Sequence, residues 1–243
     1  MRLADSLSPH FTGMVLDGVS RAIEESYRLR YQVYCHERGF LPAANYPDQQ
    51  EIDKYDRHST HFGVLNNRGE LVATARLVEQ SEAGLPMLEH CAIVPADTLL
   101  HYPKEGVVEV SRLAVSRNYN RRSGDGFYSL QGPDPDTVTH ERRLGGEIVL
   151  ALYKVLYQAS KVRGHTHWLM AMEKSLRRLL TRYGFPFVPI GPESDYYGLV
   201  APYSMNFAEF DAVITSGRIP ILAEFREGLE PPTGAPSYRP RRA

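Results

Sequence analysis

Apolar residues recur at intervals of three and four positions in three segments of the chain, as they do on one face of a helix. These segments span residues 22–38, 147–162 and 175–183. Gly39 follows the first segment and Gly184 follows the third, and glycine commonly ends a helix because it adopts positive φ at little cost. The pattern therefore predicts three helices.

Other segments are rich in β-branched and aromatic residues and predict strands. Residues 61–65 and 70–78 are separated by the turn sequence Asn66-Asn67-Arg68-Gly69, which predicts a β-hairpin. Residues 107–115 form an almost continuous apolar run, as expected for a central strand buried on both faces. The remaining strand candidates are 166–172, 185–190 and 203–214. This order of elements predicts a single-domain α/β fold with a mixed sheet and helices on its faces.

Two segments lack a regular pattern. Residues 116–146 contain five glycines and the sequence Gly-Pro-Asp-Pro-Asp, which predicts a mobile insertion. Residues 227–243 are rich in proline and predict an unstructured tail. We therefore expect one domain over residues 1–226, followed by this tail.

Composition excludes several classes of protein. The 243 residues carry a formal net charge of −1, which excludes a globally basic nucleic-acid binder. No apolar run approaches the ~18 residues of a membrane span, and the N-terminus lacks the apolar core of a signal peptide. Cys35 and Cys91 are too few for a disulfide framework, and the nine histidines show no metal-ligand spacing. We expect a cytoplasmic protein with no metal and no tightly bound cofactor.

Charged residues stand in or beside the predicted strands. Glu51, Asp53 and Asp56 precede the hairpin, Arg76 lies in its second strand, and Glu109 and Arg112 lie inside the central strand. A charge in so apolar a strand needs a partner, because an unpaired buried charge is costly. Strand alternation places Glu109, Ser111 and Leu113 on one face and Val110, Arg112 and Ala114 on the other. The residue types alone leave two alternatives to a catalytic site: a structural ion-pair network, or an acidic cluster in a solvated loop.

These residues, with their spacing, resemble the sequence pattern of the autoinducer (acyl-homoserine-lactone) synthases. The similarity comprises Arg30, Tyr34, Phe40, Glu51-x-Asp53-x-x-Asp56, Arg76 and Glu109-x-Ser111-Arg112, and it extends over the first 115 residues. Tyr34 stands where this family usually has Phe, and Phe40 stands where it usually has Trp. The chain as a whole is more similar to the related N-acyl amino acid synthases, which include acyltransferases associated with exosortase systems.

The resemblance implies a GNAT fold, with a mixed, centrally splayed sheet flanked by helices, and an acyl group donated by acyl carrier protein. It implies that the acceptor side is bound by Arg30, Tyr34, Phe40, Asp53, Asp56 and Arg76. Ser111 and Arg112 would belong to the catalytic centre, where a backbone N–H near Ser111–Leu113 faces the developing oxyanion. Aminolysis of a thioester also needs a base that removes a proton from the amine. Glu51 is the first candidate for this base and Glu109 is the second.

A second motif resembles the phosphate-binding loop that opens a helix in GNAT proteins. The motif is Arg142-Arg143-Leu144-Gly145-Gly146-Glu147, in which Arg142, Arg143, Gly145 and Gly146 would contact the donor. The negative charge of Glu147 opposes a pyrophosphate, which favours the single phosphodiester of a carrier protein's pantetheine arm over coenzyme A. The alternative is that this segment is only the glycine-rich end of the insertion.

Basic residues gather around the expected entrance for the donor. They predict a docking surface for the acidic carrier protein, or alternatively a set of solvated charges: Arg121, Arg122, Arg142, Arg143, Lys154, Lys161 and Arg163. Leu180 occupies the position where many GNAT enzymes have a tyrosine that protonates the leaving thiolate, and Tyr183 is out of register. No tyrosine general acid is therefore predicted in this helix.

The function expected from the sequence is transfer of a fatty acyl group from acyl carrier protein to the amine of an amino acid. Three alternatives remain open. They are acyl-homoserine-lactone synthesis from S-adenosylmethionine, N-acetylation from acetyl-CoA, and a non-catalytic acyl-binding module.

Overall fold

The computed structural model describes residues 7, 9–18, 20–103, 105–116 and 135–229. Its centre is an eight-stranded sheet with the order β1-β2-β3-β4-β5-β8-β6, in which β7 also pairs with β8. Of the described strand pairs, β4 and β5 run parallel and the others run antiparallel. The strands are β1 Phe11–Val15, β2 Ser59–Asn66, β3 Leu71–Val78, β4 Val107–Val115, β5 His167–Met172, β6 Val188–Pro189, β7 Ser194–Asp195 and β8 Leu199–Asn206.

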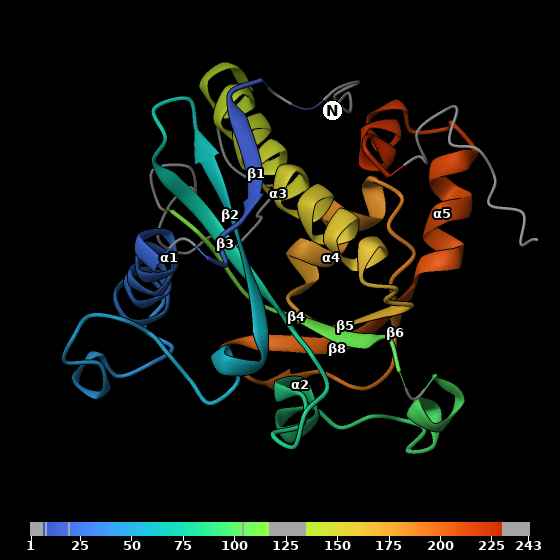
Figure 1. Ribbon diagram of the computed structural model, residues 1–243, viewed down its shortest axis with the longest axis horizontal. Coiled ribbons are helices and arrows are strands. Elements are labelled where there is room, and N and C mark those ends of the chain that lie inside the picture. Colours follow the sequence, from blue (N-terminus) through green and yellow to red (C-terminus); the bar gives the residue numbers. More distant parts are fainter. Residues whose placement is uncertain (1–6, 8, 19, 104, 117–134, 230–243) are drawn as a thin grey trace, which may run out of the picture.

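Helices cover both faces of this sheet (Figure 1). The α-helices are α1 Ser20–Tyr31, α2 Pro86–His90, α3 Pro135–Val162, α4 Lys174–Arg182 and α5 Phe207–Thr215. A π-helical segment, Gln32–Glu37, continues α1, and a 3₁₀ segment, Pro220–Arg226, follows α5. The main core packs α3, α4 and α5 against one face of the sheet. Smaller apolar clusters pack the π-helical segment and α2 against the other face.

Several elements confirm the sequence-based expectations. The central strand runs from Val107 to Val115 as predicted, and the hairpin around Asn66–Gly69 is formed by β2 and β3. Gly39 and Gly184 follow helical segments with φ of +63° and +80°, a conformation in which a Cβ atom would be strained. The helix predicted to end at Val162 does end there.

The strand predicted over residues 203–214 is wrong in its second part. β8 ends at Asn206, and α5 begins at Phe207. The side chain of Asn206 accepts a hydrogen bond from the Ala208 N–H at 2.7 Å and so caps the new helix. The buried residues of this helix recur at helical spacing: Phe207, Phe210 and Ile214. The strand was predicted because aromatic and β-branched residues favour strands and because the cap at Asn206 was overlooked.

The prediction of an irregular insertion over residues 116–146 is wrong from Pro135 onward. α3 begins at that proline, because its fixed φ suits the first helical position and the residues that follow include good helix formers. Residues 117–134 lie outside the described residues, as do residues 230–243 of the expected tail. Among the helices that are described, none is long and apolar enough to cross a membrane.

Candidate active site

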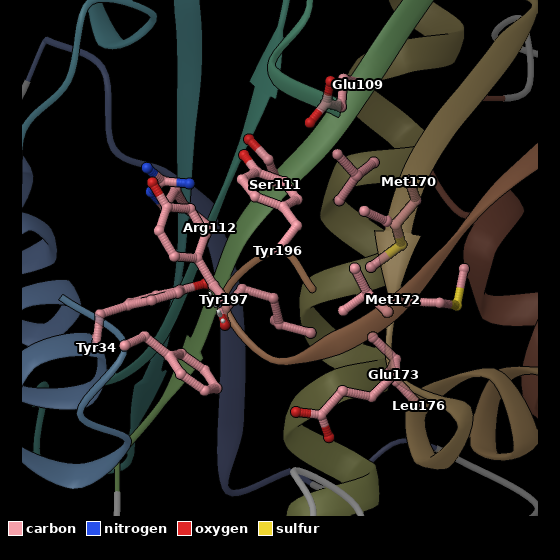
Figure 2. A pocket seen from close by; sticks show the side chains of 15 residues that line it. Tyr34, Glu109, Ser111, Arg112, Met170, Met172, Glu173, Leu176, Tyr196 and Tyr197 are labelled. Carbon is pink, nitrogen blue, oxygen red and sulfur yellow. Dashed lines mark hydrogen bonds between the residues drawn. The ribbon is translucent and has the colours of Figure 1, made fainter. Parts of the chain in front are cut away.

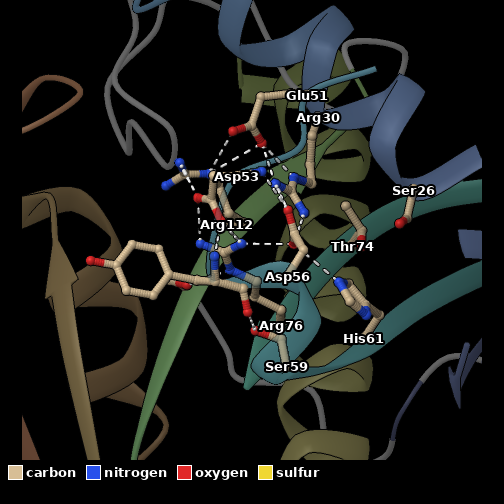
Figure 3. Close-up of polar contacts among 12 residues, drawn as sticks. Ser26, Arg30, Glu51, Asp53, Asp56, Ser59, His61, Thr74, Arg76 and Arg112 are labelled. Atoms are coloured by element: carbon tan, nitrogen blue, oxygen red, sulfur yellow. Dashed lines mark hydrogen bonds and ion pairs between the residues drawn. The ribbon is translucent and has the colours of Figure 1, made fainter. Parts of the chain in front are cut away.

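Three arginines and three carboxylates form a buried ion-pair network between the sheet and the segment that follows α1 (Figure 3). Arg30 from α1 donates to Glu51 at 2.5 Å and to Asp56 at 2.6 and 3.0 Å. Arg76 from β3 donates to Asp53 at 2.6 and 2.8 Å and to Asp56 at 2.7 Å. Arg112 from β4 joins Glu51 at 3.1 Å to Asp53 at 2.8 Å. The six charges are balanced, as buried charges must be.

The protonation states within this network follow from its geometry. Burial favours the neutral form of Asp56, but hydrogen bonding from His61 and the charge of Arg30 outweigh it and hold the pKa of Asp56 below its ordinary value. Asp53 behaves in the same way, because hydrogen bonds from Arg76 overcome its burial and lower its pKa. Both carboxylates are therefore ionised at neutral pH and act as anchors for the arginines. The network alternative raised by the sequence is thus present in the structure.

A β-bulge in β4 changes which face its side chains occupy. Arg112 has φ of +54°, and the pairing of β3 with β4 shifts between Thr74 and Arg76. The predicted grouping of Leu113 with Glu109 and Ser111 is therefore wrong. Leu113 instead joins Val110 in the main core, and Arg112 lies with Ser111 on the side of the network. The extra residue of the bulge is the physical reason, because it reverses the alternation beyond it.

The sheet splays directly beside this bulge. β4 pairs with β5 only through Val107–Glu109 and His167–Leu169. Beyond that point the two strands border an open pocket (Figure 2). Its empty volume is about 640 Å³, which includes open solvent at the mouth. Residues 109–113 of β4 and 170–172 of β5 line it, and the other lining residues are Tyr34, Phe40, Glu173, Leu176, Tyr196, Tyr197 and Val200. A mostly apolar pocket with a few polar groups is the usual form of a small-molecule site.

The two candidate bases lie in different surroundings. Glu51 is fully buried, bonds to Arg30 and Arg112, and is absent from the residues that line the pocket. Glu109 lines the pocket and accepts a hydrogen bond from the Met87 N–H at 2.8 Å. Burial raises the pKa of Glu109 to about 8, although the Met87 N–H and the charge of Arg76 act in the opposite direction. The geometry therefore favours Glu109 over Glu51, because of these two carboxyl groups only Glu109 lines the pocket.

Aromatic rings form one wall of the pocket. Tyr34 donates a hydrogen bond to the Leu113 carbonyl at 3.3 Å, and its ring is tilted against Phe40 at 6.1 Å. Tyr197 lies over the Arg112 guanidinium at 4.8 Å and contacts the edge of Tyr34 at 6.0 Å. Burial raises the pKa of both Tyr34 and Tyr196, so their hydroxyl groups stay protonated. The structure thus brings the predicted Tyr34, Phe40, Ser111 and Arg112 together at one pocket.

Several pocket residues were missed in the sequence. Tyr196 and Tyr197 come from the turn between β7 and β8, and Met170, Met172 and Glu173 come from the end of β5. Tyr197 has φ of +53°, an uncommon conformation for a tyrosine, and Gly198 follows it with φ of +98°. The pair Tyr196-Tyr197 before a glycine was the available signal for a ligand-facing turn. The methionines carried no signal, because core packing explains them equally well.

The predicted phosphate-binding loop is wrong as a loop. Gly145 and Gly146 lie inside α3, about ten residues after its start, where backbone N–H groups bond within the helix. Gly146 is buried, and a Cβ atom there would lie 3.7 Å from the Tyr183 hydroxyl of the neighbouring α4 segment. Gly146 therefore packs against the α4 segment, and a donor-binding role for Gly145 and Gly146 stays a prediction. The side chains of Arg142 and Arg143 lie outside the described residues, so their donor-binding role stays a prediction.

The predicted basic docking surface is only partly described. Lys154 pairs with Glu227 at 2.7 Å, and Lys161 pairs with Asp211 at 2.7 Å, so neither presents an isolated charge. Arg163 is exposed at the end of α3, and Arg121 and Arg122 lie outside the described residues. Within the described part of the chain, no group of three His, Cys, Asp or Glu side chains is arranged to hold a metal ion.

Comparison with known proteins places this geometry in context. Residues 29–128 match the family of acetyltransferase (GNAT) domains. No curated protein matches the sequence. Among solved structures, BjaI, a CoA-dependent acyl-homoserine lactone synthase with SAM and isopentyl-CoA, superimposes with a TM-score of 0.58 and 17% identity, covering 87% of this chain and 90% of that chain.

Two further structures have the same arrangement. FeeM, an N-acyl amino acid synthase from uncultured soil microbes, gives a TM-score of 0.54 and 16% identity, covering 84% of this chain and 95% of that chain. The AHL synthase LasI gives a TM-score of 0.52 and 17% identity, covering 82% of this chain and 90% of that chain. Together with the splayed β4–β5 pair, these matches show that the chain has the GNAT fold, in the form shared by acyl-homoserine lactone synthases and an N-acyl amino acid synthase.

Proposed function

We propose that this protein is an N-acyltransferase that moves a fatty acyl group from acyl carrier protein to the amine of an amino acid. One observation carries the proposal: a buried carboxyl group, Glu109, faces an apolar pocket at the splay of a GNAT sheet, and its pKa is close to 8. A carboxyl group of this kind can take a proton from an amine near neutral pH, because no cationic partner holds it permanently in the ionised form.

The reaction is an aminolysis that balances without a further reactant. The amine nitrogen attacks the thioester carbonyl, the C–N bond forms, and the C–S bond breaks. Glu109 takes one proton from the attacking nitrogen, and the departing sulfur takes up a proton to become a free thiol. The bulge at Arg112 makes the backbone of β4 irregular where this strand lines the pocket, which supports our expectation of an oxyanion-binding N–H near Ser111–Leu113.

The ion-pair network gives the site its rigidity. Arg112 contributes to the pocket wall while its guanidinium is held by Glu51 and Asp53, and Ser111 accepts a hydrogen bond from Arg76 at 3.0 Å. Reacting groups must be held within a fraction of an ångström for efficient catalysis. Arg30, Arg76, Asp53, Asp56 and Glu51 therefore act as positioning residues, whose effect on substrates passes through Ser111 and Arg112.

A second acceptor deserves the same test. Four aromatic rings line the pocket, and the face of such a ring attracts a cation. S-adenosylmethionine is a cationic amine, so acyl-homoserine-lactone synthesis is the alternative that this wall supports.

The deciding experiment is mass spectrometry of lipids extracted from cells that overproduce the protein. Cells that overproduce Glu109→Gln serve as the matched control. A long-chain N-acyl amino acid that appears only with the wild-type protein supports the main proposal, whereas an acyl-homoserine lactone supports the alternative. A co-purifying fatty acid without any new amide would instead identify an acyl-binding module.

A further inference from the structure

An unusual hydrogen bond lies behind the apolar wall of the pocket. The hydroxyl group of Tyr153, a fully buried residue of α3, donates to the sulfur of Met170 at 3.0 Å. A thioether is a weak acceptor, whereas buried hydroxyl groups usually pair with oxygen. Burial also raises the pKa of Tyr153, so this hydroxyl remains a donor. The contact therefore fixes the position of Met170 without providing a strong hydrogen bond.

Met170 separates the pocket from the aromatic core. Its side chain lines the pocket from β5, on the same face as Met172 (Figure 2). On its other side, the Tyr153 ring packs against Trp168 at 5.8 Å and against Phe185 at 5.4 Å. A ligand that extends along this wall thus meets a flexible side chain first and a rigid aromatic cluster behind it. Methionine adapts its shape readily because it is unbranched and has three rotatable bonds.

We propose that Met170 is the residue that sets the length of the acyl chain, and that Tyr153 positions it. This inference rests on the proposed function, since it assigns the apolar part of the same pocket to the acyl group. In this assignment Met170 forms the inner end of the pocket that it lines, and the hydrogen bond from Tyr153 holds it in that position. An acyl chain longer than the pocket must displace Met170 and break this contact.

Two substitutions distinguish the effect of the volume of Met170 from the effect of its restraint by Tyr153. Met170→Ala removes three heavy atoms, so we expect the preferred acyl chain to become longer by roughly three carbon atoms. Tyr153→Phe keeps the volume but releases Met170. We expect that change to broaden the range of accepted lengths without moving the optimum. In Met170→Ala, the Tyr153 hydroxyl would lie at the new end of the pocket.

The experiment measures binding apart from catalysis. Acyl carrier protein loaded with unreactive thioether analogues of saturated acyl chains of increasing length is titrated into the wild type, Met170→Ala, Tyr153→Phe and Met205→Ala. Met205→Ala is the matched control, because it removes an equally buried methionine that does not line the pocket. Amide formation from the corresponding thioesters is followed in parallel by mass spectrometry.

We expect Met170→Ala to bind chains longer than the wild-type optimum at least about tenfold more tightly than the wild type binds them. A methylene that fits an apolar pocket discriminates to about this degree. An unchanged optimum in Met170→Ala would overturn the inference, and so would an equal shift in Met205→Ala. Absence of acyl binding in every variant would remove the proposed function as well. A shifted binding profile without any amide product would keep the inference and remove only the proposed reaction.

Discussion

Glu51 and Glu109 are both completely buried carboxyl groups, yet their neighbours give them different chemistry. Glu51 is held by the guanidinium groups of Arg30 and Arg112, whereas Glu109 is contacted by a backbone N–H. Two acidic groups whose surroundings separate their roles in this way are typical of enzyme sites. On the sequence alone, Glu51 ranks first because its motif is the more conspicuous. The pocket geometry shows that Glu109 is the one that a bound substrate can reach.

The pH dependence of activity is the first consequence for Glu109. Its pKa lies near 8, so the ionised base becomes available as the pH rises through that value. We expect kcat/KM of the wild type to increase with an inflection near pH 8 and to level off above it, and we expect Glu109→Gln to lose about 10²–10⁴ in kcat together with this inflection. A steady-state profile for both proteins tests this expectation, and a variant with near-normal kcat would show that the base lies elsewhere.

The same group makes folding stability depend on pH. The folded-state pKa of Glu109 is raised from 4.5 to about 8, so the folded protein holds a proton that the unfolded chain releases. This contribution to stability is complete below pH 4.5 and is lost as the pH rises toward 8. We expect Glu109→Gln to lack this loss and to become more stable than the wild type above pH 8 in urea unfolding. The opposite order of stability would contradict the buried, protonated state.

Glu51 is expected to matter for folding rather than for proton transfer. Glu51→Gln leaves Arg30 and Arg112 short of a buried countercharge, and breaking a buried ion pair in this way costs about 3–5 kcal/mol. The free energy of unfolding from urea titration measures this loss. Asp17→Asn is the control, because Asp17 is exposed and its ion-pair partner is His61, so it should cost no more than about 1 kcal/mol. A Glu51→Gln variant that is as stable as the wild type but has lost both its activity and the inflection in its pH profile would restore Glu51 as the candidate base.

At the level of elements, periodicity predicted the sheet and its main helices, but it failed where one residue changes the pattern. The bulge at Arg112 is invisible to strand alternation, because a single inserted residue reverses the faces without changing the composition. The start of α3 at Pro135 was hidden by neighbouring glycines and prolines that favour a loop. In both places a local backbone feature overrides residue preference.

The junction between β8 and α5 is the third such place, and it supplies a test. Asn206 accepts a hydrogen bond from the Ala208 N–H at 2.7 Å, and its amide lies 3.1 Å from His167 Nε2. We expect Asn206→Ala to lower the free energy of unfolding by about 1 kcal/mol and Asn206→Asp to retain most of the capping contribution. Thermal or urea unfolding compares them. Equal stability of Asn206→Ala and the wild type would show that packing of Phe207 and Phe210 alone starts the helix.

For the whole molecule, the two halves of the chain contribute different parts of the site. The first half supplies the ion-pair network and β4, and the residues that carry the family resemblance lie there. The second half supplies β5, the start of α4 and the Tyr196-Tyr197 turn, which complete the pocket. The sequence therefore predicted the network residues well and the ligand-facing wall poorly, because apolar pocket residues cannot be distinguished from core residues without the fold.

The arrangement also indicates where a carrier protein would approach. α4 carries Lys174, Arg177, Arg178 and Arg182 and no acidic residue, and its N-terminal end borders the pocket at Glu173 and Leu176. Acyl carrier proteins are acidic, so this helix would attract them through charge at low ionic strength. Lys154 and Lys161 of α3 are paired and do not line the pocket, so α4 is the better placed of the two helices, although its own Lys174 is also paired, with Glu193 at 2.8 Å.

Charge reversal on α4 tests the choice of donor. Arg178 is exposed, and we expect Arg178→Glu to raise KM for acyl carrier protein on the order of tenfold at low ionic strength, with the difference shrinking as salt is added. Acyl-pantetheine, which lacks phosphate and protein, should be used equally well by both proteins. Arg68→Glu is the matched control, since Arg68 is an exposed arginine in the turn between β2 and β3 and lies outside the predicted docking surface. An equal effect of both reversals would indicate a general charge effect, and no effect of Arg178→Glu would place the carrier protein away from α4.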